Sequence, residues 1–459
     1  MMQAENLAIR PGMKAAVIGL GLSGRACLKY LLTRGVRVAA SDLGDGSDDG
    51  LQELLALEGV SFEFGRHSIG FFAGCDFAVA GPGVPLESEI ILQLRECGIP
   101  VVGELGLLAG EFDCPLIAVT GTNGKTTVTE LLGTTLTAAG LDVFAGGNLG
   151  TPACEYFLQG KGKDAVILEV SSFQLDLAGE FRPHIGILLN ISPDHLDRHG
   201  SMDNYIGAKK KLFDHQGKDD FAIIGSDVCG GEFADFGQGG RPRLLRFGCG
   251  SNLEAAIDFS RSLVSFGGEE YHLADTALVG HSGLLNAAPA IMAAALLGCP
   301  HGQILAGLKS FRPLAHRLEY VAEINGVSYY NDSKATNTGA VIEALSAVDG
   351  KKVILIAGGR DKGDDYTLLR KSLEEKVKTL ILMGEAAPVM EKKLDGSTEI
   401  LRASSLEEAV VAAAAVAAAG EVVMLSPACA SFDMFENYRV RGETFKHLVQ
   451  KMAEGHEGK

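Results

Sequence analysis

The sequence lacks the features that mark a secreted, membrane-spanning or nucleic-acid-binding protein. Its nine cysteines form no C-x-x-C pair, and an odd number spread over 459 residues is not a disulfide framework. We therefore expect the cysteines to be small buried hydrophobic residues in a reducing compartment. The N-terminal stretch has no basic segment followed by an apolar signal core, which indicates no export. The longest alanine-valine run, residues 409–420, is shorter than the roughly 20 apolar residues of a membrane span.

Positive charge is also scarce, because 41 lysines and arginines face 58 aspartates and glutamates and leave a net charge of -17. This balance argues against a non-specific binder of nucleic acid or of anionic membranes. Phosphate affinity must then come from built sites, where backbone amides and a few lysines gather locally. We expect a cytoplasmic monomer that binds no nucleic acid and does not insert into a membrane.

What the sequence does contain is a regular alternation of short apolar runs with helical patterns, which implies parallel sheets with crossover helices. Three strand–loop–helix units stand out, "KAAVIGLGLSGRACLKYLL", "PLIAVTGTNGKTTVTELLG" and "KKVILIAGGRDKGDDYTLLRKSL". Each has a glycine-rich turn before a helix N-terminus, which is a natural anion site. The length fits about three domains of roughly 150 residues. We predict an α/β protein with domains at 1–103, 104–311 and 312–459, each built around a mainly parallel sheet.

The first unit carries a dinucleotide fingerprint. "GLGLSG" at residues 19–24 matches G-x-G-x-x-G, and Asp42 ends the next predicted strand. The glycines would face a pyrophosphate and the acid a ribose, so a nucleoside diphosphate fits as well as a nicotinamide cofactor. A tight turn without a ligand, with Asp42 as a turn or cap residue, is the alternative. A second turn with Gly81, Pro82 and Gly83 could face the same crevice.

The second unit resembles a phosphate-binding loop that has fewer residues than usual between its two glycines. In "LIAVTGTNGKTTVTELLG", Val119 stands where the first glycine is expected. Lys125 can reach terminal phosphates, and the hydroxyl of Thr126 stands where magnesium is normally held. Glu169 ends the apolar strand "DAVILE", and a carboxylate at that edge of a buried sheet is a sensible magnesium ligand with Thr126.

Several further polar residues have two interpretations each. His195 and His199 are spaced i, i+4, but the stretch lacks the glutamate of a metalloprotease helix, so a zinc site is not expected. One histidine near a phosphate or a second metal, and a purely structural role, are equally compatible with the spacing. Lys209, in a run of three lysines, would ordinarily lie on a solvated helix face.

Two C-terminal stretches, "YYNDSKATNTGA" and "LSPACASFDMFENYRVRGETF", are unusually polar for segments that follow a strand. Each alone provides adequate helix capping. Together with "GGRDK" at residues 358–362, they would line one edge of the third sheet.

At this point the sequence resembles the Mur ligase family over essentially its whole length, in the branch that adds D-glutamate. The resemblance lies in "GLGLSG", "GTNGKTT", "EVSSFQL", "DHLDRH", "HRLE", "NDSKATN" and "SPACASFDMFENYRVRGE". The short loop is the form of that family. The resemblance implies a Rossmann-like N-terminal domain, a P-loop ATPase-like central domain and a Rossmann-like C-terminal domain. It implies that ATP and Mg²⁺ drive addition of D-glutamate to UDP-N-acetylmuramoyl-L-alanine through an acyl phosphate, in peptidoglycan precursor synthesis.

The resemblance also implies site residues, carried over motif by motif. Catalytic roles fall to Lys125, His195 and Lys209, the last matching a lysine that is carbamylated in the family. ATP would contact Gly121, Thr122, Asn123, Gly124, Lys125, Thr126, Thr127, Asn286, Arg317 and Asp332. Metal ions would be held by Thr126, Glu169, His195 and Lys209. The UDP-linked substrate would contact Leu22, Ser23, Asp42, Gly81, Pro82, Gly83 and Asn148. D-glutamate would contact Lys334, Thr336, Lys362, Ser431, Phe432 and Tyr438.

Two stretches depart from the family pattern. Near the adenine the family usually has a His-Asn pair and a second Asn, whereas here His281 and Asn286 stand at altered spacing. Gly81 stands where a serine is common, so that one hydrogen bond to the diphosphate would have to come from its backbone amide.

Three competing hypotheses make different predictions. Another ligase of the family would accept a different amino acid, and a folate enzyme would lack the UDP-binding domain. A nicotinamide oxidoreductase built on "GLGLSG" would leave "GTNGKTT" and Glu169 without a role. A nucleotide-driven switch would hydrolyse ATP or GTP alone, whereas a ligase needs both of its other substrates before it releases phosphate.

Overall fold

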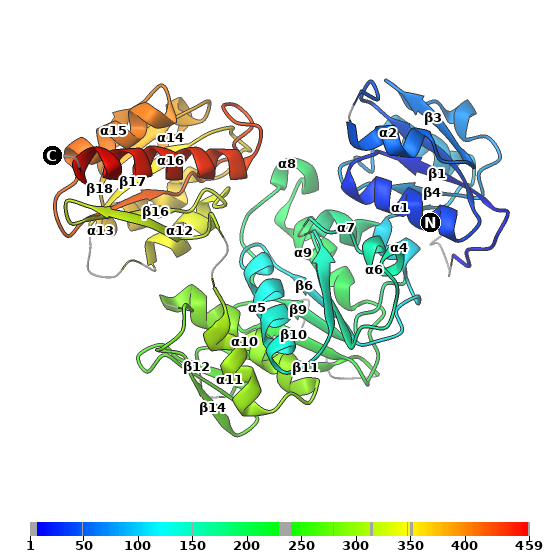
Figure 1. Ribbon diagram of the computed structural model, residues 1–459, viewed down its shortest axis with the longest axis horizontal. Helices are drawn as coiled ribbons and strands as arrows, with labels where there is room; N and C mark the ends of the chain where they lie inside the picture. The colour runs from blue at the N-terminus through cyan, green and yellow to red at the C-terminus, as the bar shows by residue number, and fades with distance from the viewer. Residues whose placement is uncertain are drawn as a thin grey trace. The chain divides into compact units, whose positions relative to one another are not determined.

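Three separate sheets organise the chain in the structure, a computed structural model (Figure 1). It describes residues 7–47, 49–148, 150–228, 240–250, 252–278, 280–312, 315–346, 348 and 352–457, without the side chains of 49, 50, 52, 197 and 455–457. By contacts, the chain divides into two compact units. The first comprises 1–190, 203–256 and 288–307, and the second comprises 191–202, 257–287 and 308–459.

The first sheet is entirely parallel and has the strand order β3-β2-β1-β4-β5. Its strands are β1 (Lys14–Ile18), β2 (Arg37–Asp42), β3 (Val60–Phe64), β4 (Phe77–Ala80) and β5 (Val101–Val102). Its helices are α1 (Leu22–Thr33), α2 (Asp49–Leu55) and α3 (Glu89–Glu96). The order reverses beside β1, so the crevice after β1 and β4 is where such a sheet binds ligands.

The second sheet has the order β14-β13-β12-β11-β10-β9-β6-β8-β7 and is parallel from β7 through β12 wherever the pairing is defined. Its strands are β6 (Leu116–Thr120), β7 (Val143–Gly147), β8 (Ala165–Glu169), β9 (Ile185–Leu188), β10 (Phe221–Gly225), β11 (Arg243–Gly248), β12 (Ala255–Asp258), β13 (Leu263–Phe266) and β14 (Glu269–His272). The helices of this part of the chain are α4 (Glu104–Leu107), α5 (Lys125–Ala138), α6 (Cys154–Leu158), α7 (Ser172–Asp176), α8 (Leu196–His199), α9 (Met202–Lys210), α10 (Gly280–Leu296) and α11 (His301–Ser310). Strands β6 and β8, which carry the phosphate loop and Glu169, lie side by side.

The third sheet has the order β15-β16-β20-β17-β18-β19, and only the edge strand β15 is antiparallel among its described pairings. Its strands are β15 (Glu319–Ile324), β16 (Val327–Asn331), β17 (Val353–Gly358), β18 (Val377–Met383), β19 (Glu399–Arg402) and β20 (Val422–Leu425). Its helices are α12 (Thr338–Ser346), α13 (Arg370–Lys376), α14 (Ala387–Leu394), α15 (Leu406–Val416) and α16 (Tyr438–Glu457).

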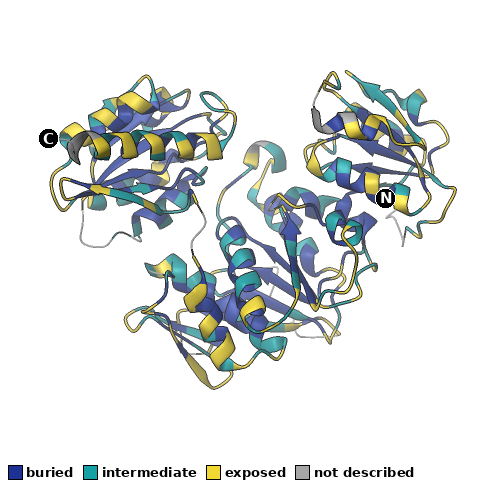
Figure 2. Ribbon diagram, in the orientation of Figure 1, coloured by how far each residue is buried: buried dark blue, intermediate teal, exposed yellow. Residues whose placement is uncertain are grey.

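The third sheet has a hydrophobic core on each face, and β17 contributes to both. Val353, Leu355 and Ala357 pack into one core, whereas Ile354 and Ile356 pack into the other. This follows from the two-residue period of a strand, which sends alternate side chains to opposite faces. A strand covered on both sides must be apolar throughout, as "VILIAG" is. Figure 2 shows the same pattern, with buried strands between helices whose outer surfaces are exposed.

The predicted fold class is confirmed: the chain has three α/β domains, each built around a mainly parallel sheet. Helix α15 has a side-chain N-cap, because the Ser405 hydroxyl accepts from the Glu408 amide, and the Glu408 carboxylate accepts from the amide of Ser404, one residue before the cap. The expectation of buried cysteines was only partly right, since Cys97 and Cys249 are exposed. Among the described residues, no helix is both long and apolar enough to span a bilayer.

Candidate active site

The phosphate-binding loop begins where β6 ends and is fixed to the neighbouring strand end at Asn190. The Thr122 amide donates to the Asn190 backbone carbonyl at 3.0 Å, and the Asn123 amide donates to its side-chain oxygen at 2.9 Å. Gly124, the residue before α5, has a φ of 83°, a left-handed conformation that glycine adopts without strain. The loop therefore leads directly into a helix N-terminus, as an anion site requires.

Two lysines converge on the carbonyl oxygens of this loop. Lys125 Nζ donates to the carbonyls of Gly121 at 2.8 Å and Thr122 at 2.7 Å. Lys209 Nζ, on α9, donates to the same Gly121 carbonyl at 2.9 Å and lies 4.6 Å from the centre of the Tyr205 ring. Only 1% of Lys209 is exposed, so its placement on a solvated helix face was wrong. The ammonium is buried because α9 turns this side chain onto the loop, where a carbonyl and an aromatic face replace water.

Glu169 lies at the carboxyl end of β8, opposite Val119 of β6 in the register of the sheet. The residue is 3% exposed, and its Oε1 accepts a hydrogen bond of 2.8 Å from Asn148 Nδ2. Thr126, in the first turn of α5, is also buried. A hydroxyl and a carboxylate are oxygen donors of the kind that Mg²⁺ prefers, so these residues fit the ion.

A cavity of about 540 Å³ opens beside the first fingerprint. All seven residues predicted to hold the UDP-linked substrate line it: Leu22, Ser23, Asp42, Gly81, Pro82, Gly83 and Asn148. They come from the N-terminal sheet and, for Asn148, from the loop after β7. His67 and Gln174 line the same cavity. No local signal in the sequence marks His67, whereas the sequence favours Gln174 as a helix-start residue, which it is in the capping box with Ser171, and as a possible polar contact.

Asp42 also shapes the turn around it. One carboxylate oxygen accepts from the Leu20 amide at 2.6 Å, and the other accepts from the Gly44 amide at 2.7 Å. The fingerprint glycine at position 24 is required by packing, because a Cβ there would overlap the carbonyl oxygen of Gly19. Both the ligand interpretation and the turn interpretation of Asp42 are therefore compatible with its position.

In the second unit, Arg441 joins the two polar C-terminal stretches. Its Nε donates to the Ser333 hydroxyl at 3.0 Å, and its Nη2 donates to the backbone carbonyls of Ser333 at 2.9 Å and Cys429 at 3.1 Å. Its Nη1 donates to the Ala430 carbonyl at 3.3 Å. Burial lowers the pKa of Arg441 to about 10, which still leaves it charged at neutral pH. Arg441 lies in the polar stretch "LSPACASFDMFENYRVRGETF", but no site role was predicted for it.

The residues predicted to hold D-glutamate lie around these two stretches. Lys334 Nζ lies 4.0 Å from the centre of the Tyr438 ring. Burial opposes ionisation of Tyr438, but Lys334 and Arg439 outweigh it and lower the pKa of the phenol. Ser431 is buried, whereas Phe432 is 62% exposed. Thr336 is half-buried between β16 and α12.

Lys362 already contacts a carboxylate, that of Asp194. The Nζ–Oδ1 distance is 3.3 Å, and Asn337 Nδ2 donates to the other oxygen of Asp194 at 3.1 Å. Asp364 lies nearby, and its pKa is raised to about 6, chiefly by burial, with Lys362 opposing and Asp194 adding to the rise. Neither Asn337 nor Asp194 was assigned a site from the sequence.

Among the carboxyl groups near the predicted ATP residues of this unit, that of Asp332 has the pKa that is shifted furthest. Burial raises its pKa to about 7, against the opposing hydrogen bond from the Ser426 hydroxyl at 2.7 Å and the nearby charge of Arg317. His195, directly before α8, has a φ of 55°, and its Nε2 lies 3.6 Å from Asp194 Oδ2. Asn286 lies within α10. The second unit thus contains Arg317, Asp332, His195 and Asn286, whereas the first contains Lys125, Thr126, Glu169 and Lys209.

Three family models match the chain in succession. The MurD-like N-terminal domain of Mur ligases matches residues 2–103, the Mur ligase middle domain matches 119–294, and the Mur ligase glutamate ligase domain matches 316–429. A curated relative from Desulfotalea psychrophila, UDP-N-acetylmuramoylalanine--D-glutamate ligase, is 47% identical over 96% of both chains. The chain belongs to the Mur ligase family.

Other comparisons agree with this assignment. A Mur ligase of the same name from Geotalea uraniireducens is 39% identical over 96% of this chain and 98% of its own. Among solved structures, the MurF ligase of Thermotoga maritima in complex with ADP has a TM-score of 0.62 at 18% identity, covering 98% of this chain and 96% of its own. A pseudomurein peptide ligase type C from Methanothermus fervidus has a TM-score of 0.61 at 18% identity, covering 96% and 100%. At this identity the two structures show the Mur ligase fold alone.

Proposed function

We propose that this chain is an ATP-dependent ligase that adds D-glutamate to UDP-N-acetylmuramoyl-L-alanine in cytoplasmic peptidoglycan precursor synthesis. The observation that carries the proposal is the 47% identity, over 96% of both chains, to the D-glutamate ligase of Desulfotalea psychrophila. We assign residues 1–103 to the UDP-linked substrate, 104–311 to ATP and 312–459 to the amino acid.

The reaction must activate a carboxylate, which is a poor acyl donor until it has a leaving group. A carboxylate oxygen of the substrate's L-alanine attacks the γ-phosphorus of ATP, and the bond to the β-phosphate oxygen breaks, giving an acyl phosphate and ADP. The amine of D-glutamate then attacks the acyl carbon. The tetrahedral intermediate releases phosphate and a proton, leaving the amide.

The cavity beside the first fingerprint supports the position of the UDP-linked substrate. Asn148 lines that cavity and donates to Glu169, so it connects the proposed substrate site with the proposed magnesium site. A substrate extending along Asn148 would bring its reactive carboxylate toward the end of β8.

Thr126 and Glu169 would hold the magnesium ion that accompanies ATP. For His195 and for Lys209, a role in supporting a second ion rests on the resemblance of their motifs to the family. Magnesium, when bound, would supply positive charge that offsets the negative charges of the phosphates and of the attacking carboxylate. Lys125 supplies further charge from the loop, since its ammonium already lies on the Gly121 and Thr122 carbonyls. The loop amides and the N-terminus of α5 orient the phosphates.

For D-glutamate, Lys334 and Lys362 would pair with its two carboxylates. The Asp194 carboxylate on Lys362 supports this role, because it shows that the lysine head group accepts such a partner. Thr336, Ser431, Phe432 and Tyr438 would surround the same amino acid, and Asn286, Arg317 and Asp332 would contact ATP.

The test is phosphate release from ATP and Mg²⁺ with UDP-N-acetylmuramoyl-L-alanine, adding D-glutamate, L-glutamate, lysine or no amino acid. We expect release only with D-glutamate, together with a product heavier by one glutamate residue. Release with a different amino acid would keep the family and overturn the acceptor. Release without any acceptor would favour a nucleotide switch.

A further inference from the structure

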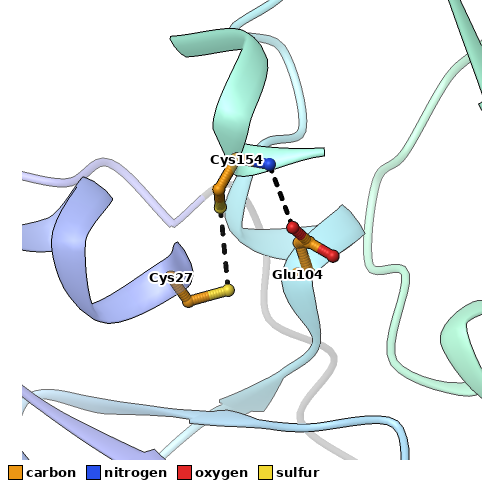
Figure 3. Close-up of side chains that lie close together, drawn as sticks. All are labelled: Cys27, Glu104 and Cys154. Carbon is orange, nitrogen blue, oxygen red and sulfur yellow. Dashed lines mark hydrogen bonds between the residues drawn. The ribbon is translucent and has the colours of Figure 1, made fainter. Parts of the chain in front are cut away.

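Three buried side chains with metal-binding atoms, none of them assigned to catalysis, meet where α1 contacts α4 and α6 (Figure 3). Cys27 Sγ and Cys154 Sγ are 3.7 Å apart, and Glu104 Oε1 accepts a hydrogen bond of 2.9 Å from the Cys154 amide. The two sulfurs and a Glu104 oxygen all lie within 4.8 Å of one another. None of the three residues is more than 4% exposed.

The simplest explanation is a structural one, in which two small thiols fill space and the glutamate binds the first amide of α6. That explanation accounts for Oε1 but not for the other carboxyl oxygen. Glu104 Oε2 is buried and has no hydrogen-bond partner of good geometry, although the nearby Ser23 hydroxyl and Ala153 amide lower the pKa of Glu104 against the larger effect of burial. A buried polar atom without a partner destabilises the fold, so a carboxyl group is a costly choice at this position unless the second oxygen has a ligand.

The spacing of the sulfurs matches tetrahedral metal coordination. With zinc–sulfur bonds of about 2.3 Å and a tetrahedral angle, two thiolates lie about 3.8 Å apart. The distance between Cys27 Sγ and Cys154 Sγ is 3.7 Å. Two thiolates with one carboxylate form a donor set that favours zinc and similar thiophilic cations over Mg²⁺.

We propose that Cys27, Cys154 and Glu104 form a binding site for a thiophilic divalent cation of the zinc class, which links α1 of the N-terminal domain to α4 and α6. When the cation binds, each thiol and the Glu104 carboxyl release one proton, and two sulfurs and one oxygen donate electron pairs to the metal. The site therefore loses three protons and gains the two positive charges of the metal ion. The fourth coordination position is open to a water molecule.

Without a cation the three groups retain their protons. Burial raises the pKa of Cys154 well above its usual value, and burial also raises the pKa of Glu104. The protonated cluster is neutral, which is the tolerable state for buried groups, and a cation binds by displacing those protons. Because Ser23 and Gly24 of the same helix line the substrate cavity, the metal would also hold that helix in place.

The experiment uses the full chain, reduced with a phosphine, in excess Mg²⁺ so that magnesium sites are occupied. Equilibrium dialysis against Zn²⁺ measures the bound metal, and Cd²⁺ reports thiolate ligation through its ultraviolet charge-transfer band. We expect the wild type to bind one equivalent more Zn²⁺ than Cys27→Ala or Cys154→Ala, and to show the cadmium band that both variants lack. Its melting temperature should rise by about 2 °C or more with Zn²⁺, and that of Cys27→Ala should not.

Two variants make the result specific. Glu104→Gln keeps an acceptor for the Cys154 amide but removes the anionic ligand, so we expect its affinity for Zn²⁺ to fall at least tenfold. Cys97→Ala removes an exposed thiol and should change neither binding nor the cadmium band. X-ray absorption of the wild-type cadmium complex should report two sulfur ligands, a readout that needs no variant. Equal metal binding by the wild type and both cysteine variants, or a single sulfur ligand, would overturn the site.

Discussion

Lys209 and Gly121 lie 88 residues apart in the sequence and are joined by a hydrogen bond of 2.9 Å between a buried ammonium and a loop carbonyl. This contact ties α9 to the turn that is proposed to bind ATP. It also buries the lysine head group, whose nitrogen lies 4.6 Å from the Tyr205 ring centre. Modification of this amine by CO₂, which the resemblance to the family implies, stays a prediction.

Replacing Lys209 with methionine tests whether this amine has a chemical role. Methionine keeps the length of the side chain and removes its charge. We expect kcat to fall by about 10²- to 10³-fold, because positively charged or metal-supporting groups at a phosphoryl-transfer site act mainly in the transition state. The melting temperature should change little. Lys218→Met, at an exposed lysine, is the control, and equal kcat values for the two variants would remove Lys209 from the mechanism.

Replacing Asn148 gives a separate prediction, since this residue lines the cavity proposed for the UDP-linked substrate and donates to Glu169. Asn148→Ala removes a hydrogen bond to a charged group, worth about 1.5 kcal/mol or more. We expect the KM for UDP-N-acetylmuramoyl-L-alanine to rise about tenfold, with a smaller change for ATP. Initial-rate kinetics with each substrate varied in turn measure both values. A rise confined to ATP would place Asn148 outside the substrate site.

The glycines of the first fingerprint offer a matched pair of substitutions. A Cβ at Gly24 would overlap the Gly19 carbonyl, whereas a Cβ at Gly21 would meet no atom within 4 Å. We expect Gly24→Ala to destabilise the N-terminal domain by about 3 kcal/mol and to abolish substrate binding, because α1 must move away from β1. Gly21→Ala should unfold like the wild type in urea. Equal stability of the two variants would mean that the helix can shift without cost.

Much of the fold was predictable, because its local and global signals agree. Strands buried on both faces are continuous apolar runs, as β6 and β17 show, and a glycine-rich turn follows each of them. The grouping of the seven residues predicted to hold the UDP-linked substrate was predictable for a related reason. Six of them stand at or just after the carboxyl ends of β1, β2 and β4, which lie along one edge of the first sheet, whereas Asn148 follows β7 of the second sheet.

The contacts that could not be predicted involve residues far apart in the sequence. A run of three lysines gives no sign that Lys209 turns inward while its neighbours do not. Arg441 is bound by carbonyl groups, which every residue has, so no sequence pattern marks its partners. The contact between Asp194 and Asn337 joins residues that are 143 positions apart in the sequence. In each case tertiary packing decides the environment, and the residue type alone is compatible with several.

Asp332 predicts a pH dependence of stability. Its pKa is about 7 in the folded protein and 3.8 as a free side chain, so the folded state holds the proton more tightly. Stability contributed by this proton is present at low pH and is lost as pH rises toward 7. Between pH 5.5 and 8, Asp332 should cost the wild type about 2 kcal/mol. Asp332→Asn should not show this loss.

The measurement for Asp332 is urea unfolding of both proteins at several pH values, followed as the difference between them so that other titrating groups cancel. The exposed Asp395→Asn serves as the control for a change of one charge. A difference between the wild type and Asp332→Asn that stays constant from pH 5.5 to 8 would contradict the raised pKa.

Replacing Arg441 tests whether the proposed amino-acid site depends on a residue that need not touch the substrate. Its guanidinium donates four hydrogen bonds to the segments that carry Lys334 and Ser431. Arg441→Lys keeps the charge, but an ammonium cannot reach all four acceptors from one point, so buried carbonyls lose their partners at about 1 to 3 kcal/mol each. We expect the KM for D-glutamate to rise at least about tenfold while the KM for the UDP-linked substrate stays within about twofold, because the cavity proposed for that substrate is lined by other residues. Arg402→Lys, at an exposed ion pair with Glu391, controls for the substitution itself. If both KM values rose together, the effect would be a general loss of folded protein, and Arg441 would have no particular connection with D-glutamate.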